Sequence, residues 1–211
     1  MNKNGVICKF FILFVFFNSN LFSQYNTARI AILSGGVVNF NFKTVQDYKN
    51  GIESNNTVIG ISMSDINPGT APSSQIVDGF ELYFSSTASS IIGDNASNTI
   101  PLSAIQASAA IISGFATGTN TLNTYQDLTG PITSNSSASP PLGNVLMKYD
   151  AAGIPLSAGV FSINTSNQIR IYFQCGMNTI TPNKLLGSTA DYYSVPIELW
   201  LWPQCNSGDC P

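Results

Sequence analysis

The sequence contains no histidine. This absence excludes Ser-His-Asp and Cys-His catalysis and histidine-ligated zinc, and it removes the most frequent general base near pH 7. The sequence also has no Gly-x-Ser-x-Gly or Asp-Thr-Gly run, phosphate-binding loop or dinucleotide-binding fingerprint. We therefore expect a protein that is not an enzyme, with no catalytic residue, metal or cofactor.

Charge is scarce as well. Only 9% of the 211 residues are charged, against roughly 25% in an average soluble protein. The chain has eight Lys and Arg residues and eleven Asp and Glu residues, which gives a formal net charge of −3 and a pI of about 4.6. So few basic residues build no basic surface, and we expect no nucleic-acid partner.

The longest apolar run lies close to the N-terminus, at Phe10–Phe17, and Lys3 and Lys9 precede it. At about 1.5 Å per residue a helix of this length is too short for a hydrocarbon core of roughly 30 Å. The pattern predicts a secretory signal peptide over residues 1–24, with Cys8 inside it. We expect an exported protein, extracellular or at the outer cell surface, with the periplasm as the alternative and no transmembrane span in the mature chain.

Alternation of apolar and polar residues predicts strands along most of the remaining chain. The alternating segments are Val38–Lys43, Ile59–Met63, Phe80–Phe84, Ile169–Gln174 and Val195–Trp202. Turn-forming residues separate them, as at Asn67–Gly69 and Asp150–Gly153. Strands with one apolar face indicate an all-β fold of antiparallel sheets in a β-sandwich with long loops. We place one domain at residues 25–205 and a Cys-containing tail at residues 206–211.

Two segments are less regular. Between Pro101 and Ala116 the apolar residues also fit helical spacing. We expect a strand over Ile100–Ala107, followed by either a helical turn or a second strand. Residues 118–143 are rich in Thr, Asn, Ser and Pro, and we expect an exposed loop there.

Three cysteines remain after the signal peptide: Cys175, Cys205 and Cys210. A Cys205–Cys210 disulfide closes a short turn over residues 206–209, and a Cys175–Cys205 disulfide ties two strand ends together for about 3–4 kcal/mol. Either pairing leaves one cysteine for an intermolecular bond, a free thiol or a buried inert position. Three thiols without histidine lack a fourth ligand for zinc.

A tryptophan pair is the strongest candidate site. Trp200 and Trp202 stand two residues apart on a predicted strand, so their rings project from one face about 7 Å apart, together with Glu198. Val195, Ile197, Leu199 and Leu201 form the opposite, core-facing side. Exposed paired aromatics suit a glycan platform or a protein interface. The alternative is that the tail or a loop covers both rings.

The order of segments is similar to that of exported bacterial surface domains of immunoglobulin-like or pilin-like type, the spore-coat-U and WxL-like sandwiches. The resemblance is carried by Gly79–Phe84 followed by Asn98–Ser103, and by Leu186–Tyr193 leading into Val195–Leu201. It spans much of residues 36–202 and implies an immunoglobulin-like β-sandwich, a surface location and structural or adhesive work, with no catalytic residues. The sequence departs from the pattern at the Cys-x4-Cys tail and the tryptophan pair, and it lacks a cysteine near the mature N-terminus.

Our first interpretation is a non-catalytic, secreted cell-surface protein with a structural or adhesive role, either a fimbria-like subunit or a surface-layer component. Its partners are then other surface subunits or further copies of itself, joined at open strand edges such as Tyr193–Trp202. The alternative is a carbohydrate-binding module that uses Trp200 and Trp202, with Tyr83 or Tyr172, to bind glycans. The third interpretation is a secreted hydrolase built on carboxylates.

Overall fold

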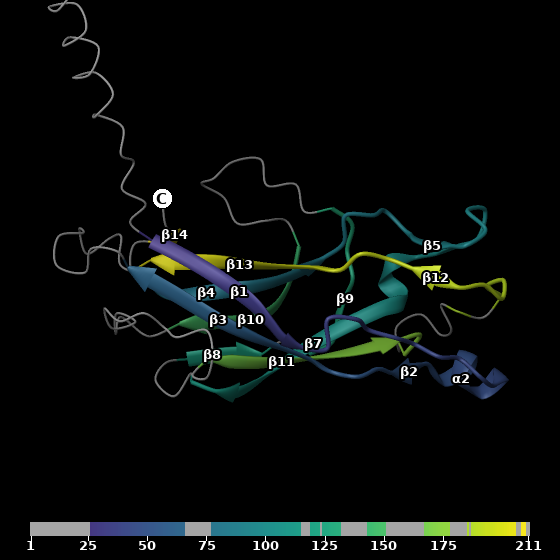
Figure 1. The fold of residues 1–211 in the computed structure, drawn as a ribbon, viewed down its shortest axis with the longest axis horizontal. Coiled ribbons are helices and arrows are strands. Elements are labelled where there is room, and N and C mark those ends of the chain that lie inside the picture. Colours follow the sequence, from purple (N-terminus) through teal and green to yellow (C-terminus); the bar gives the residue numbers. More distant parts are fainter. Residues whose placement is uncertain are drawn as a thin grey trace, which may run out of the picture.

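The computed structural model describes residues 26–65, 77–114, 119–122, 124–131, 143–150, 167–177, 185, 187–205 and 208–209. The predicted signal peptide and Cys210 lie outside these ranges. Within them, strands in antiparallel sheets form nearly all of the regular structure, and the only helices are α2 (Val45–Asn50) and the 3-10 turn η2 (Leu102–Ala104) (Figure 1). The prediction of an all-β, antiparallel fold is confirmed.

Two larger sheets carry most of the strands. The first sheet has the order β1-β3-β11-β7-β9, with β2 paired to β11. The bounds of its strands are β1 (Asn26–Ser34), β2 (Ile52–Glu53), β3 (Thr57–Asp65), β7 (Ile105–Ser113), β9 (Gln126–Asp127) and β11 (Gln168–Cys175). The second sheet has the order β14-β13-β4-β10-β8. Its strands are β4 (Val77–Ser85), β8 (Thr119–Leu122), β10 (Asn144–Asp150), β13 (Glu198–Cys205) and β14 (Gly208–Asp209).

A third, smaller sheet joins β5 (Ile91–Gly93), β6 (Thr99–Ile100) and β12 (Tyr193–Ser194) in the order β12-β5-β6. It lies at the same end of the molecule as α2, and β14 lies at the opposite end (Figure 1). Asp191 links its loops, because its carboxylate accepts hydrogen bonds from the Asn98 side chain at 2.9 Å and the Asn95 backbone at 3.1 Å.

The two larger sheets share one apolar core. Ile59 and Ile169 enter it from the first sheet, and Leu82 and Phe84 enter it from the second. The ring centroid of Phe84 lies 6.1 Å from that of Phe173 on β11, so side chains of the two sheets meet directly. Burial of each such side chain stabilises the folded state by about 1.5–3 kcal/mol. The apolar positions of the alternating pattern lie on the inner faces of the strands.

The strand predicted at Val38–Lys43 is wrong, although its pattern has a physical basis. Val38, Phe40 and Phe42 do pack against the core, but residues 38–43 form no ladder with another strand. The chain then enters α2, where the Thr44 hydroxyl accepts a hydrogen bond from the Asp47 backbone N–H. Alternation therefore marked which side chains turn inward, and it did not require a hydrogen-bonded strand.

The predicted last strand is divided into two. Tyr193–Ser194 forms β12 in the third sheet, and β13 in the second sheet begins only at Glu198. Pro196 lies in the break, and because proline has no N–H it donates nothing to a ladder. Along β13, Glu198–Cys205 pairs with β4 on one side, with a register shift between Gln204 and Cys205, and only Gln204 and Cys205 pair with β14 on the other.

Two further segments differ from expectation. The ambiguous stretch after Pro101 forms η2 and then the long strand β7, with no α-helix. The predicted exposed loop at residues 118–143 contributes β8 to the second sheet and β9 to the first, and its Leu128 is buried in the core. Both corrections have one cause: pairing with strands distant in sequence supplies hydrogen bonds that local composition does not reveal.

Candidate functional site

The second sheet positions the tryptophan pair on its outer face. Leu199 and Leu201 of β13 pack against the core, and because side chains alternate along a strand, Glu198, Trp200 and Trp202 project the other way. The Trp200 side chain is 41% exposed, whereas Glu198 and Trp202 are half-buried. The expected division of this strand into a core side and an outer side is present, with Trp200 the more accessible ring.

Strand β4 supplies the neighbours of the two tryptophans. Its register places Tyr83 directly opposite Trp200, and Glu81 directly opposite Trp202. Directly opposite side chains in an antiparallel pair lie about 4.5–5.5 Å apart at Cβ, within contact distance for aromatic rings. Glu81, Tyr83, Glu198, Trp200 and Trp202 thus occupy one continuous area, which we call the Trp200 surface.

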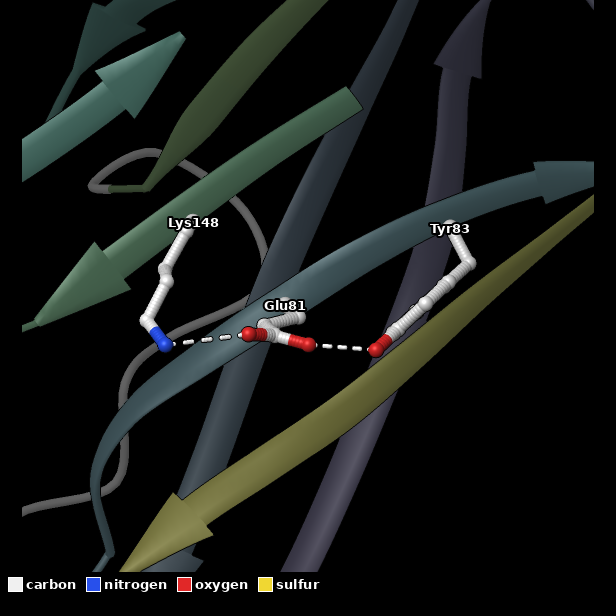
Figure 2. A network of polar contacts seen from close by, with 3 residues as sticks. All are labelled: Glu81, Tyr83 and Lys148. Carbon is white, nitrogen blue, oxygen red and sulfur yellow. Dashed lines mark hydrogen bonds and ion pairs between the residues drawn. The ribbon is translucent and has the colours of Figure 1, made fainter. Parts of the chain in front are cut away.

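A polar network holds the β4 side of the Trp200 surface. Figure 2 shows the Glu81 carboxylate between two donors: the Lys148 ammonium of β10 lies 3.0 Å from one oxygen, and the Tyr83 hydroxyl donates to the other. Lys148 is directly opposite Glu81 in the β4–β10 ladder. Both carboxylate oxygens of Glu81 therefore have a protein partner, and this residue orders the surface.

Glu198 orients the exposed indole. The Trp200 Nε1–H donates a hydrogen bond of 3.3 Å to Glu198 Oε2, and this is the only donor that an indole possesses. The bond restrains the ring while leaving its faces available for stacking. With its flat aromatic faces and a carboxylate acceptor beside them, this area suits non-covalent binding of a ligand that has both C–H faces and hydroxyl groups.

One buried hydroxyl lies at the end of this area. Ser85 is opposite Glu198 in the β13–β4 ladder and is fully buried. Its Oγ has no hydrogen-bond partner among the described residues. Because Ser85 follows Glu81 and Tyr83 at spacing two, it belongs to the same side of β4.

Tyr172, the other tyrosine considered for a glycan site, belongs elsewhere. It lies on β11 in the first sheet, where Ile171 and Phe173 on either side of it point into the core. Tyr172 therefore faces outward from the first sheet, on the opposite side of the molecule from Trp200. The structure brings together only Tyr83 and the tryptophan pair.

Of the three cysteines, only Cys175 has its side chain among the described residues. Cys175 is a free, buried thiol at the end of β11, beside β2, and burial raises its pKa to about 12. Because Cys175 is a free thiol, this structure contains no Cys175–Cys205 disulfide. The backbone of Cys205 ends β13 next to β14. The side chains of Cys205 and Cys210 lie outside the described residues, and the Cys205–Cys210 pairing stays a prediction.

Sequence reasoning missed Glu81 and Lys148. A signal for Glu81 was present, because it alternates with Phe80 and Leu82 and so shares the outer side of its strand with Tyr83. Nothing local joins Lys148 to it, since the two residues meet only through the β4–β10 register.

Within the described ranges, no three Cys, Asp or Glu side chains gather closely enough to hold a metal ion, and no helix has the length and apolar character needed to cross a membrane. No known family model matches the sequence, and no curated protein is similar enough to it to indicate a relative.

Proposed function

We propose that this chain is a non-catalytic, exported cell-surface protein with an immunoglobulin-like β-sandwich fold, and that its work is adhesion through the Trp200 surface. The observation that supports this proposal is the exposed Trp200 ring, held by Glu198 and placed against Tyr83. A large aromatic side chain is costly to leave in water, and rigid exposed aromatics of this kind are frequent anchors of binding sites.

The ligand class that fits this surface best is a neutral glycan. The C–H faces of a pyranose ring stack on an indole, and its hydroxyl groups donate to a carboxylate such as Glu198. Glu81 and Glu198 place two negative charges here, and the one Lys148 charge is already engaged by Glu81. An anionic ligand would meet net negative charge, which favours uncharged sugars.

The test is a screen of the mature protein against neutral glycans, followed by titration calorimetry on a glycan that binds. Trp200→Ala should weaken binding at least about tenfold, which corresponds to roughly 1.4 kcal/mol, and Trp202→Ala should weaken it less. The matched control is Tyr192→Ala, since Tyr192 is 84% exposed but lies beside the third sheet. Equal affinity of parent and Trp200→Ala protein for every glycan bound would contradict the proposal.

A second candidate function, a structural subunit, is favoured by the sheet edges. Among the described strands, β1 pairs only with β3, and most of β13 pairs only with β4. On β1, Ile32 is 60% exposed and Leu33 is also exposed. A strand edge that has no hydrogen-bonded neighbour and carries apolar side chains is a template for pairing with another chain.

Light scattering over a concentration series, with and without reductant, distinguishes the two candidates. Growth of the mass with concentration, and its loss in an Ile32→Lys variant, would support a building block. Reversal by reductant would implicate an intermolecular disulfide. A mass equal to one chain at all concentrations would contradict assembly through edges and leave adhesion as the function.

A further inference from the structure

The outer face of the first sheet carries both arginines of the chain. Arg29 on β1 is opposite Ser62 of β3, and Arg170 on β11 is opposite Val58 of β3 and Ala110 of β7. Ile169 and Ile171 on either side of Arg170 are buried in the core, so Arg170 itself faces outward. Both arginines of this acidic protein thus lie on the side opposite to the Trp200 surface.

Arg170 is distinct because it is half-buried and has no counter-ion among the residues that the structure describes. None of the described residues forms an ion pair or a hydrogen bond with its side chain, and its cross-strand neighbours, Val58 and Ala110, are small and apolar. A guanidinium in such surroundings is less screened than one in water, so an incoming anion is attracted more strongly. Its planar fork matches a carboxylate with two parallel hydrogen bonds.

Aromatic rings adjoin this arginine. Tyr172 follows Arg170 at spacing two on the same face and is opposite Ser108 of β7. Tyr125 lies close by: its hydroxyl hydrogen-bonds Ser108, and its pKa is raised chiefly by partial burial, with smaller effects from Glu53 and Tyr172. Two half-buried tyrosines beside small residues offer a shallow surface for a sugar ring.

The described acidic residues on this face lie level with Gln174, which is two residues beyond Tyr172 and four beyond Arg170 along β11. Across four strands, Glu53, Gln174, Gln106 and Asp127 form a transverse row. The Gln174 amide donates to the Gln106 side chain at 2.6 Å, which in turn donates to Asp127 at 2.6 Å. The Asp127 carboxylate is thus engaged by an amide, and Tyr172 separates this row from Arg170.

We propose that this face binds an acidic polysaccharide, with Arg170 pairing with a uronate carboxylate and Tyr172 stacking on the adjoining sugar ring. The site is separate from the Trp200 surface and binds anionic rather than neutral glycans. The charge of the whole chain supports a specific contact over general electrostatic attraction. Without the predicted signal peptide, which contains Lys3 and Lys9, the chain has six basic and eleven acidic residues. A protein of that net charge has no general attraction for a polyanion.

Affinity electrophoresis and calorimetry of the mature protein on polygalacturonate test this proposal. The matched probe is fully methyl-esterified polygalacturonate, which keeps the sugar backbone and removes the carboxylate charge. We expect binding to the first probe and at least about tenfold weaker binding to the second. Absence of polygalacturonate binding by the folded protein, or equal binding of both probes, would overturn the proposal.

Variants then locate the contact. Arg170→Ala should weaken polygalacturonate binding at least about tenfold, and Arg170→Lys should also weaken it, because an ammonium keeps the charge without the fork. The control is Lys43→Ala, which removes an exposed cation just before α2 and should leave the affinity unchanged. Thermal unfolding shows that each variant is folded. Unchanged affinity in Arg170→Ala protein, or binding of dextran sulfate without polygalacturonate, would refute a uronate site.

Discussion

Trp200 and Tyr83 are directly opposite each other on adjacent strands, yet Trp200 is 41% exposed and Tyr83 only 4%. The difference gives the two aromatic residues different tasks. Tyr83 is held in place by its hydrogen bond to Glu81 and is almost completely covered. The Trp200 ring is accessible to a ligand, so substitutions at the two positions should have separable effects.

Tyr83→Phe should lower stability and leave most ligand binding intact. The substitution keeps the ring but removes the hydroxyl that donates to Glu81, and it leaves one carboxylate oxygen of a largely buried residue without that donor. The loss should be about 1–2 kcal/mol in the free energy of unfolding. Denaturant titration measures it, with glycan affinity as the second readout. A large loss of affinity with unchanged stability would contradict these roles.

Phe84→Ala should destabilise the protein strongly. The Phe84 ring is fully buried and meets Phe173 across the two sheets, so its removal opens a cavity at their contact. Substitutions of this kind cost about 3–5 kcal/mol. Val37→Ala is the control, because Val37 is largely exposed and should change stability by less than about 0.5 kcal/mol. Similar unfolding midpoints for the two variants would show that the sheets do not share this core.

The thiols should react in a defined order. Cys175 is buried and its pKa is raised to about 12, so at pH 8 the thiol is protonated and shielded, and the folded protein should not expose it to a thiol reagent. In denaturant without reductant, one thiol per mature chain should react if Cys205 and Cys210 are bonded. Three reactive thiols would refute that disulfide, and rapid reaction of Cys175 in the folded state would contradict its burial.

Protonation of the Asp191 carboxylate at low pH should destabilise the third sheet. Hydrogen bonds to its carboxylate, chiefly from the Asn98 side chain and then from the Tyr192, Asn95 and Asp94 backbone, lower its pKa from the ordinary value of 3.8. A lowered pKa means that the stabilisation is present in full above 3.8 and is lost as the pH falls through the folded-state value. The difference in thermal unfolding between the parent and Asp191→Asn protein should therefore be largest at pH 7 and should shrink as the pH falls below 3.8. A constant difference would contradict this linkage.

Part of the Trp200 surface could be predicted from local pattern alone. The alternation in β13 placed Trp200 and Trp202 opposite Leu199 and Leu201, and the structure has that division. At Val38–Lys43 the same alternation correctly predicted that Val38, Phe40 and Phe42 face the core, but it wrongly predicted a strand. A period of two reports which side chains are buried, and only a neighbouring strand decides whether the backbone forms a ladder.

The all-β class and the inward and outward sides of most strands follow from the local pattern, because alternation of side chains is a local property of an extended backbone. Which residues meet depends on the tertiary structure. It paired Tyr83 with Trp200 and Glu81 with Lys148, moved Tyr172 to the other sheet, and set Arg170 between Val58 and Ala110. Strand order and register depend on contacts between residues far apart in the chain, and these contacts build both candidate surfaces.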